Sequence, residues 1–119
     1  MLLSTLFQDC DELLTAPKLP ATKLASKECY ESMFKNCYNL IQAPELPATE
    51  LSVGCYSNMF KGCTKLISGP SELPATILKD NCYLEMFSGC SSLINIPDLP
   101  AIVLQYRCYA NMFNNCKSL

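Results

Sequence analysis

The sequence contains no histidine and no tryptophan, and only 17% of its 119 residues are charged. Histidine is the side chain most often used for acid–base catalysis near neutral pH and for binding metals. A nucleophilic serine or cysteine also needs a base beside it, and histidine is the usual one. We therefore expect a protein that is not an enzyme and that uses no cofactor and no metal.

Two further absences limit the partners. Nine basic residues stand against eleven acidic ones, the net charge is −2 and the pI is near 5.0, which argues against nucleic acid as a partner. No apolar run approaches the roughly 18 residues that cross a bilayer, so direct membrane insertion is not expected. With half of its residues hydrophobic, the chain is also unlike a disordered one.

What the sequence does contain is a repeat. The five phenylalanines stand 27, 26, 27 and 26 residues apart, and the prolines and cysteines fall into two columns each at the same spacing. The shared unit reads Cys-Tyr-x-x-Met-Phe-x-x-Cys-x-x-Leu-Ile-x-x-Pro-x-Leu-Pro-Ala-Thr-x-Leu. It has 26 residues, with one single-residue insertion between Leu24 and Cys29 and another at Ser71. Residues 1–119 are thus predicted to form a single solenoid of about four repeats plus partial terminal units.

Within one unit, the apolar pattern predicts two kinds of local structure. At about 100° per residue, the apolar residues of 29–37 share one arc, which predicts a short outer helical turn there and at the equivalent 2–10. The residues before the first proline predict short parallel strands at 13–16, 40–43, 66–69 and 93–96, because proline lacks the N–H that would continue a strand. The expected fold class is an α/β repeat solenoid, leucine-rich-repeat-like, with short parallel strands on one face and short helical turns on the other.

The nine cysteines allow three interpretations. Disulfides are possible, but the number is odd and the first copy has Leu2 where other copies have Cys. A position that accepts Leu suits a buried free thiol, which we favour. Zinc is the weakest reading, because a repeated seven-residue gap without histidine does not fit a structural zinc site. The Met-Phe and Tyr columns share the arc with Cys, so we expect them, Phe60 among them, to form the core and not an aromatic ligand platform.

Two columns vary between copies while the apolar columns hardly change. A fixed frame that carries variable polar columns on one face is how solenoids build extended binding surfaces. The alternative is that these are unconstrained surface positions, including an acidic column that is a solvated stripe. The candidate binding face consists of Thr15, Lys18, Gln42, Glu45, Ser68, Glu72, Asn95 and Asp98.

The repeat unit quoted above resembles a BspA-type leucine-rich repeat, in the Cys-Tyr-x-x-Met-Phe variant of surface proteins from gut Bacteroides-like bacteria and some of their phages. The resemblance covers essentially all 119 residues; Ile102 and Val103 depart from it, as do Leu2, Leu3 and Leu6. It implies a leucine-rich-repeat solenoid at the cell surface that adheres to a protein or glycan ligand on a host or partner surface. The alternative is a structural or receptor-contacting module of a bacteriophage virion, tail- or fibre-associated, and a third reading is the accessory domain of a secreted hydrolase.

Both ends of the chain fall within a unit. Neither end has the polar cap that solenoids normally carry, and the N-terminus does not read as a signal peptide. We expect a segment of a longer repeat protein; the alternative is end-to-end stacking of the open ends on further repeats or other subunits.

Overall fold

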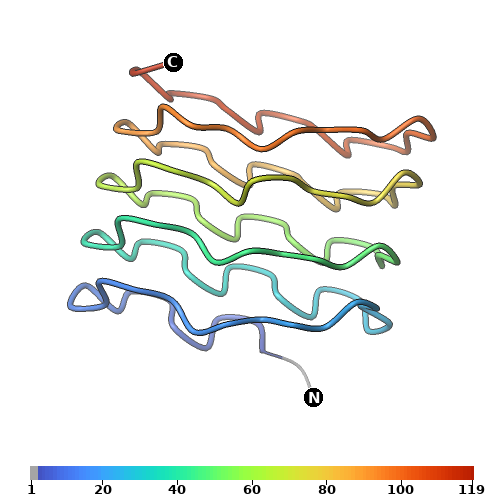
Figure 1. Ribbon diagram of the computed structural model, residues 1–119, viewed down its shortest axis with the longest axis horizontal. Helices are drawn as coiled ribbons and strands as arrows, with labels where there is room; N and C mark the ends of the chain where they lie inside the picture. Colours follow the sequence, from blue (N-terminus) through green and yellow to red (C-terminus); the bar gives the residue numbers. More distant parts are fainter. Residues whose placement is uncertain (1–2) are drawn as a thin grey trace.

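The computed structural model describes residues 3–119. Residues 26 or 27 positions apart lie side by side, so the chain advances as a pile of coils from the N-terminus to the C-terminus (Figure 1). Each coil has a side formed by Cys-Tyr-x-x-Met-Phe residues and a side formed by the proline residues. The Cα radius of gyration is 12.6 Å, and the principal extents are 33 × 31 × 20 Å.

The predicted fold class is wrong. Residues 3–119 contain no α-helix, no 3₁₀-helix and no β-strand, and their only pairing of the β type is a set of isolated parallel bridges. There is consequently no sheet on one face and no helical layer on the other, and the α/β leucine-rich-repeat solenoid is not what this sequence forms. The coils are held by turns and by single bridges.

The helical turn predicted at 29–37 is instead a chain of tight turns. We call this stretch and its equivalents, 3–10, 55–63, 82–90 and 108–116, the turn segments. Alternate amides point in two directions: the Met33 amide donates to the Tyr30 carbonyl three residues back (3.2 Å), whereas the Phe34 amide donates to the Met59 carbonyl of the next coil (2.9 Å). In an α-helix both amides would bond four residues back. The prediction for 2–10 begins in residues 1–2, outside the described residues, and 3–10 forms turns, not a helix.

The sequence resembles a helix here because the turns repeat every four residues, close to the helical period of 3.6. Every fourth residue, counted from the one just before a turn segment, has a positive φ, a region open mainly to Gly, Asn and Asp. In the second coil these residues are Glu28, Ser32 and Asn36, with φ of 55–60°. The other members of this left-handed set are Thr5, Asp9, Gly54, Asn58, Gly62, Asn81, Glu85, Gly89, Arg107, Asn111 and Asn115.

The strands predicted before the first proline are also wrong. We call 13–24, 40–51, 66–78 and 93–104 the proline segments. Each pairs with the next through an isolated bridge at its third residue, in the series Thr15–Gln42–Ser68–Asn95. Two residues later comes a proline, whose nitrogen has no hydrogen to donate, so pairing stops before a strand can form. Three further isolated bridges lie later in the segments, at Lys23–Glu50, Glu72–Asp98 and Ile77–Val103.

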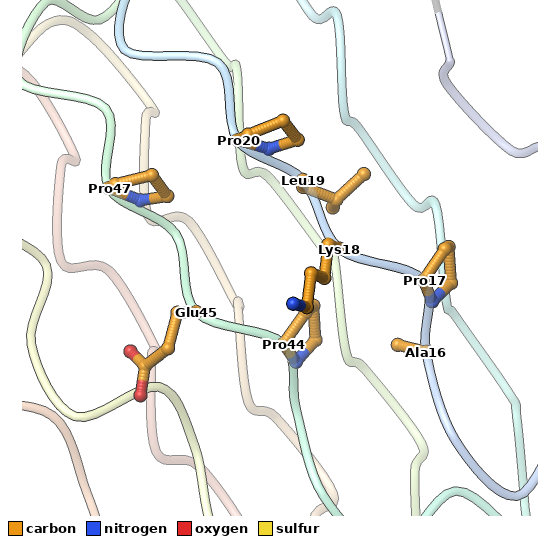
Figure 2. Close-up of a pocket in the computed structure, with 8 residues that line it drawn as sticks. All are labelled: Ala16, Pro17, Lys18, Leu19, Pro20, Pro44, Glu45 and Pro47. Carbon is orange, nitrogen blue, oxygen red and sulfur yellow. The ribbon is translucent and has the colours of Figure 1, made fainter.

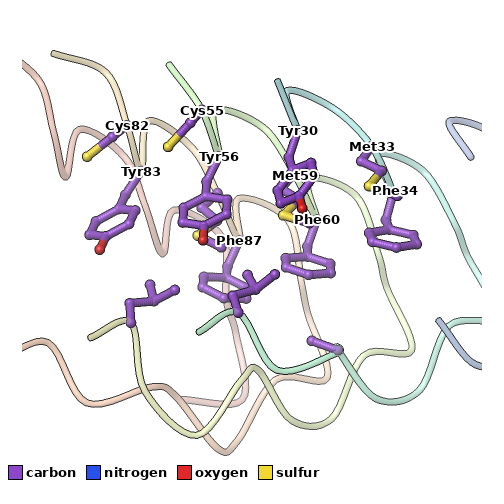
Figure 3. Close-up of a cluster of buried hydrophobic side chains, with 14 of the residues drawn as sticks. Tyr30, Met33, Phe34, Cys55, Tyr56, Met59, Phe60, Cys82, Tyr83 and Phe87 are labelled. Atoms are coloured by element: carbon purple, nitrogen blue, oxygen red, sulfur yellow. The ribbon is translucent and has the colours of Figure 1, made fainter. Parts of the chain in front are cut away.

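The core is a set of side-chain ladders that run through the coils (Figure 3). Neighbouring rings of the phenylalanine column lie with their centroids 5.4–5.7 Å apart and their planes within 2–8° of each other. Phe34, Phe60 and Phe87 are fully buried, while Phe7 and Phe113 in the outermost coils are partly buried. The prediction that Phe60 belongs to the core is confirmed.

The cysteines line the same core. All nine are free thiols and eight are buried; Cys10, in the first coil, is exposed and departs from the prediction. In the second cysteine column, the Cys63 thiol donates to the Phe34 carbonyl of the previous coil (3.1 Å), and Cys37, Cys90 and Cys116 make the equivalent bond. Burial raises the pKa of the Cys37 and Cys82 thiols to about 11. The buried thiol acts as a small core side chain whose hydrogen satisfies a carbonyl of the neighbouring coil.

Candidate binding face

The proline segments carry all eight residues of the candidate binding face. Seven of them are exposed, and Ser68 is half-buried. The structure brings them together as two columns: the bridges join Thr15, Gln42, Ser68 and Asn95 in one, and the bridge between Glu72 and Asp98 lies in the other. Because each column takes one residue from each coil, the face extends along the whole pile.

The first column presents amide and hydroxyl groups. The Asn95 side-chain amide donates to the Ser68 hydroxyl (2.8 Å), and the Gln42 side-chain amide donates to the carbonyls of Ala43 (3.2 Å) and Gly69 (3.5 Å). Adjacent coils are therefore linked by side chains as well as by bridges. The resulting strip is uncharged and polar, which suits hydrogen bonding to a peptide backbone or a sugar.

In the second column, Glu45 has a structural task. Its carboxylate accepts hydrogen bonds from the Ser71 amide and the Ser71 hydroxyl at 3.0–3.1 Å. Ser71 is the extra residue of the third proline segment, so Glu45 supplies partners to the backbone that the insertion leaves out of register. This role was missed at the sequence level because Glu45 and Ser71 lie 26 positions apart.

Lys18 stands beside a hollow of about 330 Å³ between the first two proline segments. Figure 2 shows the rings of Pro17, Pro20, Pro44 and Pro47 around it, with the Lys18 side chain lying near Pro44 and the Glu45 carboxylate turned away. Within residues 3–119 the Lys18 amine makes no ion pair, whereas the other charged residue of the hollow, Glu45, is bonded to Ser71.

The sequence reasoning missed an exposed aliphatic column. Leu14, Ile41, Ile67 and Ile94 are 42–58% exposed, next to the polar column. The side chains of Ile41, Ile67 and Ile94 line a second hollow of about 460 Å³ together with Lys65. Each follows a leucine of the core, such as Leu40 or Leu66 with 0% exposure, so the in–out alternation of extended chain was the available signal.

A carboxyl pair lies apart from this face, in the second turn segment. Glu31 lies beside Glu28, and a hydrogen bond from that neighbour, partial burial and the repulsion between the two carboxylates raise the pKa of Glu31 to about 7. Gly54, Asn58 and Glu28 line the same hollow, of about 370 Å³. Within residues 3–119 no three His, Cys, Asp or Glu side chains are grouped so that they could hold a metal ion.

In the part of the chain that the structure describes, no helix has the length and apolar character to cross a membrane. Comparisons of the chain with protein-family models, with curated proteins and with solved structures returned no match. The geometry of the face is therefore what a functional proposal rests on.

Proposed function

We propose that this chain is a non-enzymatic binding or adhesion module that holds a protein or glycan ligand on its candidate binding face. The observation that carries the proposal is the alignment of the variable residues: the polar column from Thr15 to Asn95 is continuous and exposed except at the half-buried Ser68, and the aliphatic column from Leu14 to Ile94 runs beside it. A strip that combines hydrogen-bonding groups with apolar area has the composition of a protein-recognition surface.

Exposing four neighbouring aliphatic side chains to water is unfavourable in free energy, and a surface that contacts only solvent gains nothing from it. Scattered apolar residues on a surface are ordinary, but a contiguous patch is typical of an interaction site. The aliphatic column is contiguous because the repeat places one member in every coil, and its members lie in the same parallel register as the bridges.

The place of action that we propose is the extracellular surface of a bacterium. The support is the resemblance of the Cys-Tyr-x-x-Met-Phe unit to BspA-type repeats of surface proteins, which concerns the sequence and not the α/β fold class. Free thiols are compatible with such a location here, because burial keeps eight of the nine away from oxidants.

Binding to arrayed glycans and to purified extracellular host proteins tests the proposal. We expect a ligand whose binding is lost when Gln42 and Ser68 are both replaced by Lys, because two charges would interrupt the polar strip. The matched control replaces the exposed Thr49 and Thr76, outside the face, by Ala and should bind as the wild type does. Binding that survives the double Lys substitution, or an absence of any ligand, would refute the proposed function.

A further inference from the structure

The hollow beside Lys18 differs chemically from the rest of the candidate binding face. Its wall consists of four proline rings together with Ala16 and Leu19, so it is almost entirely apolar. Proline offers C–H surface but no N–H donor. A volume of about 330 Å³ is at the small end of the range of about 300–1,000 Å³ for ligand pockets, which suits a single side chain better than an oligosaccharide.

The hollow carries one charge of each sign, from Lys18 and from Glu45. In the column of Lys18, the later coils carry Glu45, Glu72 and Asp98, so the first coil alone presents a cation. The Glu45 carboxylate keeps its negative charge, but its hydrogen bonds with Ser71 hold it turned away from the Lys18 amine (Figure 2). Among residues 3–119, Lys18 is thus a positive charge without an ion-pair partner at the rim of an apolar surface.

This combination selects among ligand classes. A neutral sugar carries many hydroxyl groups, and each one buried against proline without a partner would cost free energy. An aromatic ring would instead place apolar area on the proline rings, and a carboxylate beside it would meet the Lys18 amine. Opposite charges across an interface mainly improve specificity and the rate of association.

We propose that the Lys18 hollow binds an aromatic side chain that is flanked by a carboxylate on a protein partner. This inference rests on the proposed function, because it names the partner chemistry at one point of the candidate binding face. The part of the ligand that enters the hollow is thus an acidic aromatic segment of a protein.

The probe is the blocked dipeptide N-acetyl-Phe-Glu-amide, titrated into the ¹⁵N-labelled chain and followed by NMR. We expect shifts of the Lys18, Leu19 and Glu45 amide signals and a dissociation constant that rises about tenfold in Lys18→Glu. That substitution installs the acid that the next two coils already carry, so the fold should tolerate it. Lys65→Glu, which reverses a charge at the other hollow, is the matched control and should leave the dissociation constant unchanged.

Three comparison probes make the result decisive. N-acetyl-Phe-Gln-amide and N-acetyl-Ala-Glu-amide should each bind more weakly, and N-acetylneuraminic acid should not shift these signals. Absence of shifts with the Phe-Glu probe, equal binding of the Gln probe, an unchanged Lys18→Glu variant or preferential binding of the sugar would overturn the inference. Any of these outcomes leaves the proposed function standing if the Gln42 and Ser68 variant still loses its ligand.

Discussion

The two sides of each coil are built from the same repeat but are held together differently. In the turn segments, every second amide donates to the next coil, as Tyr56 does to Cys82 (3.0 Å) and Phe60 to Met86 (2.9 Å). In the proline segments the backbone bonds between coils are less regular, because one to three isolated bridges join each neighbouring pair and the two prolines of each segment have no N–H to donate. Both sides bury side-chain ladders, phenylalanine on the turn side and leucine on the proline side, but only the turn side has a regular ladder of backbone bonds.

This difference predicts which substitutions destabilise each side. A backbone hydrogen-bond ladder tolerates many side chains but depends on φ at each position. A side-chain ladder tolerates irregular backbone, including the extra Ser71, but depends on the volume of each apolar residue. Four predictions follow this division, in order of decreasing effect.

The largest effect is expected from truncating a core ring. Phe60 is fully buried between Phe34 and Phe87, so Phe60→Ala should lower the free energy of unfolding by about 3–5 kcal/mol. On the proline side, Leu73→Ala at a residue 1% exposed should cost about 2–5 kcal/mol. Urea unfolding measures both, and Phe113→Ala in the partly buried last coil is the control with a smaller loss. Equal losses for Phe60 and Phe113 would contradict the ladder.

The second prediction concerns backbone conformation on the turn side. Gly62 has a φ of +79°, and an added Cβ would also meet the Asn36 side-chain oxygen, so Gly62→Ala should cost more than the about 1–2 kcal/mol of left-handed strain. Gly89 has a similar φ of +77°, but a Cβ added there would lie 3.6 Å from its nearest neighbour, the Gly62 nitrogen, which is an ordinary contact, so Gly89→Ala should show the strain alone. Thermal denaturation compares the two; an Ala at position 62 without cost would disprove the left-handed assignment.

The third prediction introduces a glycine at a left-handed position, where it should raise stability and not lower it. Ser32 has a φ of 55° and is 5% exposed, so Ser32→Gly should stabilise the chain by about 0.5–1 kcal/mol through relief of strain. Ser88 is equally buried, at 6%, but does not belong to the left-handed set. Ser88→Gly should therefore destabilise, and chemical unfolding of the pair shows whether the sign follows φ. Destabilisation by both substitutions would contradict the proposed strain.

The smallest effect is a dependence on pH that belongs to the turn side, where every cysteine lies in or at the end of a turn segment. Burial raises the pKa of Cys63 from an ordinary 9.0 to about 12. A thiol whose pKa is higher in the folded state contributes stability below pH 9 and loses it as the pH rises from 9 toward 12. The urea midpoint of the wild type should fall between pH 8 and pH 10, and less steeply in Cys63→Ala. Identical pH dependences of the urea midpoint in the wild type and in Cys63→Ala would show that the Cys63 thiol does not cause the effect.

The sequence predicted the columns and much of what they contain, but not the local conformation. The positions of Phe60, the buried cysteines and the exposed acidic column followed from the periodicity, because a residue that recurs in every coil keeps its neighbours. The helical turns were wrong because an apolar repeat of four residues is hard to distinguish from 3.6 over nine residues. Asn36, Asn58 and Gly62 at the left-handed positions were the signal that could have separated the two.

The candidate face was predicted as to position but not as to chemistry. Exposure of Gln42 or Asp98 followed from their variability among copies, whereas the bond from Ser71 to Glu45 depends on an insertion 26 residues away. The exposure of the isoleucine column was also missed, although the in–out alternation of extended chain predicts that an Ile beside a buried Leu points outward.

In the turn segments, odd and even positions differ: one set of amides donates to the next coil, and the other set donates within its own coil. Inserting one residue there would turn every following amide from the next coil toward its own coil, and would move each left-handed position onto a residue unsuited to it. The two insertions in this chain, after Leu24 and at Ser71, both lie outside the turn segments. The turn side thus fixes the register of the hydrogen bonds between successive coils. The proline side is where the number of residues per coil can change.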